Sequence, residues 1–263
     1  MIMAPALLAF FLGLAFGSFL NVCIARLPKD ESISFPPSKC PKCQTPIKFY
    51  DNIPVLSFLL LRGRCRACHE SISPRYPLVE LLTGLVTALF VWKWQASPAW
   101  LAVSLPAVYV LIVVSVIDFE TMLISDAFSL TLFALGLAGS YFNPFFDGGW
   151  AARLGSSAAG AAAGAGFIWA LALLGRALYK KEAVGEGDIF LMGGIGALCG
   201  WQGVLTAIVM ASFFGSVYGV TLLALKRADR MSHMPFGPFL ALGAAVNLFS
   251  LVRPSDFFIA LPF

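Results

Sequence analysis

Long apolar runs separated by short polar breaks dominate the chain. Residues 1–25 carry no charged side chain, and residues 94–117 are also uncharged. The longest uncharged run, residues 189–225, has 37 positions. As one helix it would extend roughly 55 Å at about 1.5 Å per residue, against a hydrocarbon core of about 30 Å. One crossing cannot contain it, so the pattern predicts that the run folds back near residues 199–203.

The same pattern predicts an all-α polytopic membrane protein with about eight transmembrane helices. The predicted spans, in chain order, are residues 1–25, 77–92, 94–117, 127–146, 154–175, the two halves of 189–225, and 235–252. Residues 1–25 lack the basic start of a signal peptide and are too long for one, so they are interpreted as a retained first helix. Residues 26–76 form a small polar domain, and residues 77–263 form a membrane core with about seven helices.

Composition agrees with a chain embedded in a lipid bilayer. Hydrophobic residues make up 59% of the sequence and charged residues only 12%. A soluble protein of this length could not bury so much apolar surface. The formal net charge of +4 is too small to indicate a nucleic-acid partner. The bilayer is therefore the expected environment.

The basic residues predict the orientation of the eight spans. With residues 26–76 in the cytoplasm, the breaks at 118–126, 176–188 and 226–233 lie there too, and this side collects 15 of the 18 Lys and Arg residues. The positive-inside rule favours this arrangement, with both termini on the other side. Nine of the 15 lie in the small polar domain: Arg26, Lys29, Lys39, Lys42, Lys48, Arg62, Arg64, Arg66 and Arg75.

Two CxxC pairs stand in the polar domain, Cys40-Pro-Lys-Cys43 and Cys65-Arg-Ala-Cys68. Each second cysteine is followed four positions later by isoleucine, which indicates a duplicated knuckle. Paired thiolates on tight turns suit structural, tetrahedral zinc, and four protein ligands would leave no open position for catalysis. Disulfides are the alternative, but the predicted cytoplasmic location is reducing. We expect His69 to be a bystander, and Cys23 and Cys199, which lie in apolar runs, to be core residues.

Two acidic clusters border apolar runs on the same predicted side of the membrane. One is Asp118-Phe119-Glu120, with Asp126 close behind, and the other is Gly185-Glu186-Gly187-Asp188. Peptide hydrolysis by paired carboxyls needs one group to activate water and another to supply a proton. Asp118 and Asp188 could form such a pair, although each alone could also be a solvated border residue or a helix cap. Glu120, Asp126 and Glu186 compete for the acid roles, and Asp126 is the candidate cap of the fourth span.

Several small or polar residues inside the apolar runs have structural interpretations. Asn21 is expected to hydrogen-bond a neighbouring helix, and Glu80 to favour the positive end of the second span. The glycines of the fifth span are expected to permit close helix packing, because no lysine follows as in a phosphate-binding loop. These glycines are Gly160, Gly164 and Gly166.

Taken together, these motifs resemble bacterial type IV prepilin leader peptidases, which are membrane aspartic peptidases of the GxGD class. The resemblance runs almost end to end. The matching stretches are residues 17–22, 26–28, the double CxxC with 50–54 and 60–63, 73–82, 117–120, 185–188 and 235–243. So many motifs in the same order make a chance match very improbable.

The resemblance implies that Asp118 and Asp188 are the catalytic pair and that Cys40, Cys43, Cys65 and Cys68 bind zinc. It implies a protein of the bacterial inner membrane, with active site and zinc domain cytoplasmic and both termini periplasmic. The family cuts the basic leader from prepilins and pseudopilins after a glycine, just before an apolar helix. Members with the cysteine domain commonly methylate the new N-terminus with S-adenosylmethionine, and no motif for this donor is visible here.

Two positions depart from the family pattern, and two other functions remain open. The family often has Pro at Ser125 and Lys at Phe190; the second departure removes a positive charge near Asp188 and bears on substrate range or activity. A non-enzymatic transporter or scaffold with a zinc docking domain would show no proteolysis, but transporters usually hold charged residues nearer the membrane centre. A pure methyltransferase would act on pre-cut substrate after either aspartate is replaced.

Overall fold

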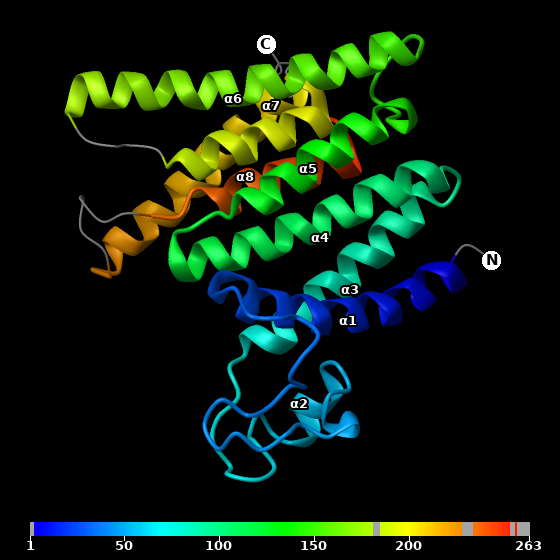
Figure 1. The fold of residues 1–263 in the computed structure, drawn as a ribbon, viewed down its shortest axis with the longest axis vertical. Coiled ribbons are helices and arrows are strands. Elements are labelled where there is room, and N and C mark those ends of the chain that lie inside the picture. Colours follow the sequence, from blue (N-terminus) through cyan, green and yellow to red (C-terminus); the bar gives the residue numbers. More distant parts are fainter. Residues whose placement is uncertain (1–2, 181–184, 228–233, 253–255, 257–263) are drawn as a thin grey trace. The chain divides into compact units, whose positions relative to one another are not determined.

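The computed structural model describes residues 3–180, 185–227, 234–252 and 256, and every regular element within these ranges is a helix (Figure 1). The helices are α1 (Met3–Arg26), α2 (Leu56–Leu60), α3 (Arg75–Trp94), α4 (Pro98–Thr121), α5 (Asp126–Gly139), α6 (Trp150–Tyr179), α7 (Glu186–Ala224) and α8 (Gly237–Phe249), with short 3-10 helices at Leu27–Lys29, Phe49–Asp51 and Ser140–Phe142. The predicted all-α class is confirmed.

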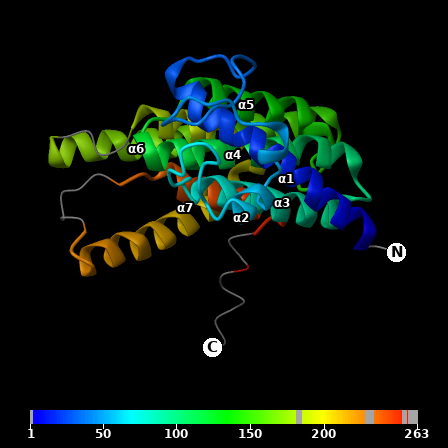
Figure 2. The same ribbon diagram turned by 90° about the horizontal axis from the view of Figure 1, so that it is seen from below.

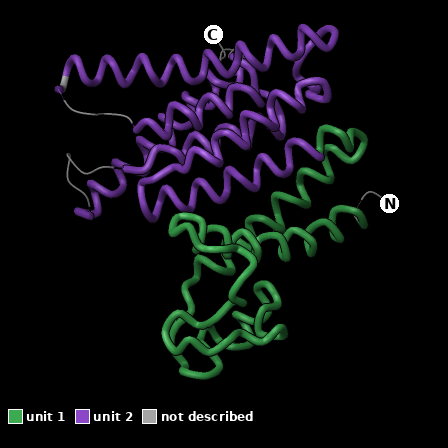
Figure 3. Tube along the Cα trace, viewed as in Figure 1, with its two compact units in different colours: residues 1–101 green, residues 102–263 purple. Residues whose placement is uncertain are grey.

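Five of these helices, α1, α3, α4, α6 and α7, are long and apolar enough to cross a membrane. Helices α5 and α8 are apolar but have only 14 and 13 residues, fewer than the roughly 20 that one crossing needs. They coincide with the predicted fourth and eighth spans, so the count of eight crossings stays a prediction. The chain divides into two compact units, residues 1–101 and 102–263 (Figure 3).

In the first unit, α1 packs along α3. A Cβ added at Gly17 would lie 2.7 Å from the Cα of Glu80, so the two backbones approach more closely there than a side chain permits. Asn21 Nδ2 donates a hydrogen bond of 3.0 Å to the carbonyl oxygen of Tyr76, at the start of α3. This confirms the interhelical role predicted for Asn21.

Glu80 joins α3 to the polar domain in the same unit. Its side chain is buried, and Oε2 accepts a 2.7 Å hydrogen bond from the backbone N–H of Val55. Val55 has φ 61° and ψ −48°, and the following Leu56 N–H donates to Pro54 O at 2.6 Å, which makes a strained γ-turn. The expected role at the positive end of the helix is wrong, because Glu80 lies in the second turn and binds this turn instead.

In the second unit, α5, α6 and α8 all pack against α7 (Figures 1 and 2). A Cβ added at Gly160 would overlap the carbonyl oxygen of Gly196, and one at Gly164 would overlap that of Met192. Helices α6 and α7 are therefore in backbone contact, as predicted for these two glycines. The prediction is wrong for Gly166, which has no atom within 4 Å of an added Cβ.

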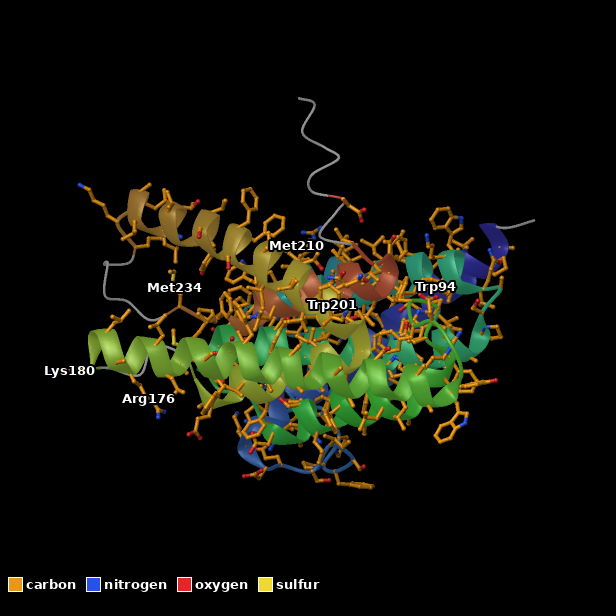
Figure 4. All side chains as sticks on the ribbon, turned by 90° about the horizontal axis from the view of Figure 1, so that it is seen from above. Trp94, Arg176, Lys180, Trp201, Met210 and Met234 are labelled. Carbon is orange, nitrogen blue, oxygen red and sulfur yellow. The ribbon has the colours of Figure 1, made fainter. Side chains whose placement is uncertain are left out.

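Helix α7 breaks at Gly200, inside the predicted turn. Gly200 has φ 68° and ψ 178°, a conformation that is essentially restricted to glycine, and an added Cβ would lie 2.9 Å from the ring of Phe146. Trp201, labelled in Figure 4, directly follows the break. The beginning and the end of α7 lie toward the same side of the unit (Figures 1, 2 and 4). The predicted fold-back near residues 199–203 is therefore present.

Candidate active site and cysteine cluster

Asp118 lies in the last turns of α4 and is only 4% exposed. Its Oδ2 accepts a 3.0 Å hydrogen bond from the backbone N–H of Gly237, the first residue of α8. A Cβ added at Gly237 would lie 2.8 Å from the same oxygen. Because Gly237 has no side chain, the first turn of α8 can approach the Asp118 carboxyl group and orient it.

Asp188 lies in the first turn of α7 and is half-buried. Its backbone N–H donates to the carbonyl oxygen of Gly185 at 3.2 Å, which closes the turn that begins the helix. The carboxyl Oδ1 is buried and has no hydrogen-bond partner among the described residues. A buried carboxylate oxygen without a partner is costly, so this atom needs a ligand or a function.

Ile124, in the loop between α4 and α5, connects the surroundings of the two aspartates. A Cβ added at Gly187 would lie 2.9 Å from Ile124 Cβ, and one added at Gly237 would lie 3.1 Å from Ile124 Cδ1. Asp118 also acts electrostatically on Asp188. The structure thus gathers the end of α4, the start of α7 and the start of α8 around one point, with both predicted aspartates there.

The three other acidic residues considered for the catalytic roles are more exposed than Asp118 and Asp188. Glu120, Asp126 and Glu186 are all exposed. The N-cap of α5 is Ser125 rather than Asp126, and no side chain makes a capping hydrogen bond there. The predicted capping role of Asp126 is therefore wrong. The side chain of Phe190, where the family often has lysine, is 56% exposed.

Three aromatic rings from α4, α7 and α8 contact one another, and the sequence analysis did not find this contact. Phe119 of α4, Tyr218 of the second half of α7 and Phe239 of α8 form what we call the aromatic cluster. Ring centroids lie 6.0 Å apart for Phe119 and Tyr218, 6.1 Å for Phe119 and Phe239, and 5.6 Å for Tyr218 and Phe239. Residues this far apart along an apolar sequence carry no signal of their contact.

The four cysteines of the polar domain converge on one point. Their Sγ atoms all lie within 4.8 Å of one another, with Cys40 and Cys68 at 3.9 Å and Cys43 and Cys65 at 4.0 Å. Tetrahedral zinc with Zn–S bonds of about 2.3 Å requires sulfur separations of about 3.8 Å. The donor set and its spacing therefore fit a metal ion, and all the cysteines are free rather than disulfide-bonded.

The predicted duplication of the knuckle is visible in the backbone. Cys40 N–H donates to Thr45 O at 3.0 Å, and Cys65 N–H donates to Glu70 O at 2.8 Å, at equivalent positions. The residue after each second cysteine, Gln44 or His69, has a positive φ of 58° or 57°. His69 thus occupies a turn position that Gln44 fills in the other copy. Its side chain is exposed and is not a member of the cysteine group.

Hydrogen bonding favours the thiolate form of two of these cysteines. Hydrogen bonds with Thr45 lower the pKa of the Cys43 thiol to about 6. The backbone N–H groups of Cys68 and Ala67 lower the pKa of the Cys65 thiol. Because the thiolate is the form that binds metal, these hydrogen bonds prepare the sulfurs of Cys43 and Cys65 for coordination.

Two family models match this chain, one in its N-terminal part and one in its C-terminal part. Residues 11–94 match the bacterial peptidase A24 N-terminal domain, and residues 105–220 match the type IV leader peptidase family. A prepilin leader peptidase/N-methyltransferase of Aeromonas hydrophila is 37% identical over 92% of this chain and 89% of its own length. The chain belongs to the type IV leader peptidase family.

Further relatives in this family carry the same name. Those of Stutzerimonas stutzeri and Neisseria gonorrhoeae are 36% and 38% identical, covering 94% and 89% of this chain and 91% and 86% of their own lengths. No solved structure gives a significant match. The leader peptidase match at 105–220 contains Asp118 and Asp188, and the N-terminal match at 11–94 contains all four clustered cysteines.

Proposed function

We propose that this member of the leader peptidase family is a membrane aspartic endopeptidase. It removes the basic leader of type IV prepilins and pseudopilins and methylates the new N-terminal residue. The observation that carries the proposal is the meeting of Asp118 and Asp188 around Ile124 and Gly237. Membership of a peptidase family argues against the transporter or scaffold interpretation.

The two carboxyls divide the chemistry of hydrolysis between them. One accepts a proton from the attacking water, whose oxygen bonds to the scissile carbonyl carbon, and the other donates a proton to the leaving amine as the C–N bond breaks. The Gly237 N–H fixes one oxygen of Asp118. The open hydrogen-bonding capacity of Asp188 Oδ1 suits it to bind the water. The leader leaves with a new carboxylate, and the mature chain keeps the new amine.

The four cysteines point to zinc, whereas the methyl donor is indicated by the names of the relatives. Cys40, Cys43, Cys65 and Cys68 would hold zinc, and because four thiolates leave no position for substrate, the ion would stabilise the domain. Methylation is inferred from the names of the relatives, and S-adenosylmethionine would supply the methyl group. We assign no residues to this donor.

The excess of basic residues supports a site at the cytoplasmic face of the bacterial inner membrane, with both termini periplasmic. The apolar helix of the substrate would approach through the bilayer, and its basic leader would remain in the cytoplasm. Hydrolysis at the membrane border then needs no passage of the charged leader through lipid, which would be costly.

The test is direct cleavage by the purified full-length protein in lipid nanodiscs. A precursor with a basic leader, a glycine and an apolar helix should be cut after the glycine, and S-adenosylmethionine should add a methyl group to the new N-terminus. Mass spectrometry of both products measures the two activities separately. An intact precursor would overturn the peptidase, and a cut but unmethylated product would overturn only the methyl transfer.

Gly237→Ala should lower kcat/KM for leader removal by about ten- to a hundredfold, because an error of about 1 Å in a catalytic group has effects of this size. The added methyl would lie 2.8 Å from Asp118 Oδ2 and displace the carboxyl group. Gly166→Ala is the matched control, since an added Cβ there meets no atom within 4 Å. Equal activity of the two variants, with equal melting temperatures, would show that Gly237 does not position Asp118.

A further inference from the structure

The short helix α2 exposes large apolar side chains although it belongs to the polar domain. Leu56 is 48% exposed, Leu59 64% and Leu60 74%. The buried residue of α2 is Ser57, whose hydroxyl donates a 3.0 Å hydrogen bond to the carbonyl oxygen of Tyr50. Single exposed leucines are common in soluble proteins, but leucines that face outward opposite a buried serine reverse the pattern of a helix surrounded by water.

Glu80 fixes the level of α2 along the membrane helices of the same unit. Its buried carboxyl accepts the hydrogen bond from the N–H of Val55, the residue directly before α2, and another from the Ser18 hydroxyl of α1. Glu80 lies five residues after Arg75, the first residue of α3, which is about 7.5 Å along a helix. Interfacial helices bury their apolar face about 5–10 Å into the boundary between headgroups and acyl chains. The start of α2 is held at a comparable level.

The surface of α3 is already apolar at this level. Leu78, one turn after the start of α3, is 62% exposed, and α3 is long and apolar enough to cross a membrane. Arg75 stacks on the ring of Tyr76 at 4.9 Å, and such residues are typical of the polar boundary of a bilayer. Helix α2 lies on the side of the polar domain toward the first half of α1, away from the end of α1 (Figures 1 and 2). Its leucines therefore face the region that lipid occupies.

Positive charge without a partner follows the exposed leucines. The side chains of Arg62 and Arg64 are exposed and make no hydrogen bond or ion pair within the part of the chain that the structure describes. Arg66, by contrast, is paired with Asp51 at 2.6 Å. The three arginines and Leu60 line a hollow of about 630 Å³. Arginines beside apolar side chains can lay their stems along the apolar surface and direct their charge to lipid phosphate.

We propose that Leu59, Leu60 and Arg62 form an interfacial surface that binds anionic phospholipid of the membrane that α1 and α3 enter. The two leucines lie among the acyl chains, and the guanidinium group lies at the phosphate. The polar domain is then held at the membrane by lipid as well as by the hydrogen bond between Glu80 and Val55. This contact requires no peptidase activity, so it is independent of the proposed function.

Photo-cross-linking tests the lipid contact in the full-length protein. Benzoylphenylalanine replaces Leu60 in nanodiscs that contain phosphatidylglycerol and phosphatidylcholine, and mass spectrometry identifies the adducts. Leu8 of α1, which is 63% exposed, is the positive control, and the exposed Lys42 of the first knuckle is the negative control. Position 60 should form lipid adducts at a yield similar to position 8, whereas position 42 should give at most about a tenth of that yield, because its level is not fixed by the helices.

The charge of Arg62 should select the anionic lipid. The ratio of phosphatidylglycerol to phosphatidylcholine adducts at position 60 should exceed their ratio in the disc by at least about fivefold, the effect of one basic residue near charged lipid. Arg62→Gln should lower the adduct ratio by about the same factor. Lys42→Gln removes an exposed basic residue of the same domain outside the hollow and should keep the ratio. An adduct ratio that equals the composition of the disc would overturn the role of Arg62.

Leu60→Asp tests the depth of α2 without a cross-linker. A carboxylate is costly among acyl chains, so amide exchange of residues 56–62 in nanodiscs should become at least about tenfold faster, with the zinc content unchanged. Unchanged exchange would mean that Leu60 faces water, where such a replacement has little effect. Position 60 without lipid adducts, or with adducts to a protein chain instead, would also overturn the lipid surface. A protein that forms the lipid adducts but cuts no precursor would sustain this surface and overturn the peptidase function.

Discussion

Asp118→Asn and Asp188→Asn should each lower leader removal by at least about a thousandfold, since general acid and base groups contribute effects of this order. Asparagine keeps the size of the side chain, and its carbonyl oxygen can still accept the hydrogen bond from Gly237 N–H at position 118. The lost property is therefore the ability to exchange a proton. The measurement is kcat/KM on a precursor in nanodiscs, followed by mass spectrometry.

Asp126→Asn is the matched control for both variants. Asp126 is exposed at the start of α5, and its replacement should leave cleavage within about twofold, as for ordinary surface changes. Methyl transfer to a pre-cut substrate should survive in the two aspartate variants. Undiminished leader removal by either folded variant would show that the hydrolytic pair includes another carboxyl, and the exposed Glu120 and Glu186 would be the next to test.

The parts of the fold that sequence reasoning predicted are those set by length and local chemistry. An uncharged run of 37 residues exceeds one crossing, so a break was required, and Gly200 supplies it within the predicted stretch. The two CxxC turns have the same local spacing, which predicted both the duplication and the convergence of four sulfurs. In each case a few adjacent residues contain the whole physical cause.

A contact between two distant segments could be predicted only where each segment carries a recognisable motif. The acidic motifs at 118 and 188 were paired because charge placed them at one face of the membrane. Two hydrogen bonds were missed: the one that Gly237 N–H donates to Asp118, and the one that Val55 N–H donates to Glu80. A backbone donor has no sequence signature. Gly166 was wrongly assigned to helix packing, because composition does not show which face of α6 meets α7.

Removing zinc should unfold the polar domain and leave the second unit folded. Structural zinc contributes about 10–16 kcal/mol to the folding of zinc-finger peptides. In the described residues, the regular structure of this domain consists of short helices and two isolated bridges, which cannot supply comparable stability without the ion. Purified protein should contain one zinc per chain. After chelation, amide hydrogen exchange should rise throughout residues 38–72 and stay unchanged in α5 to α8.

Cys43→Ser and Cys68→Ser should reproduce the effect of chelation, because each removes one of the four ligands. Cys23→Ala is the matched control, since Cys23 is a buried cysteine of α1 outside the cluster and should leave the zinc content at one per chain. We also expect methyl transfer to depend on the cysteine domain, and therefore to be lost in the two ligand variants. Full zinc content in folded Cys43→Ser and Cys68→Ser would mean that the ion is bound elsewhere, and unchanged exchange after complete chelation would mean that the knuckles fold without it.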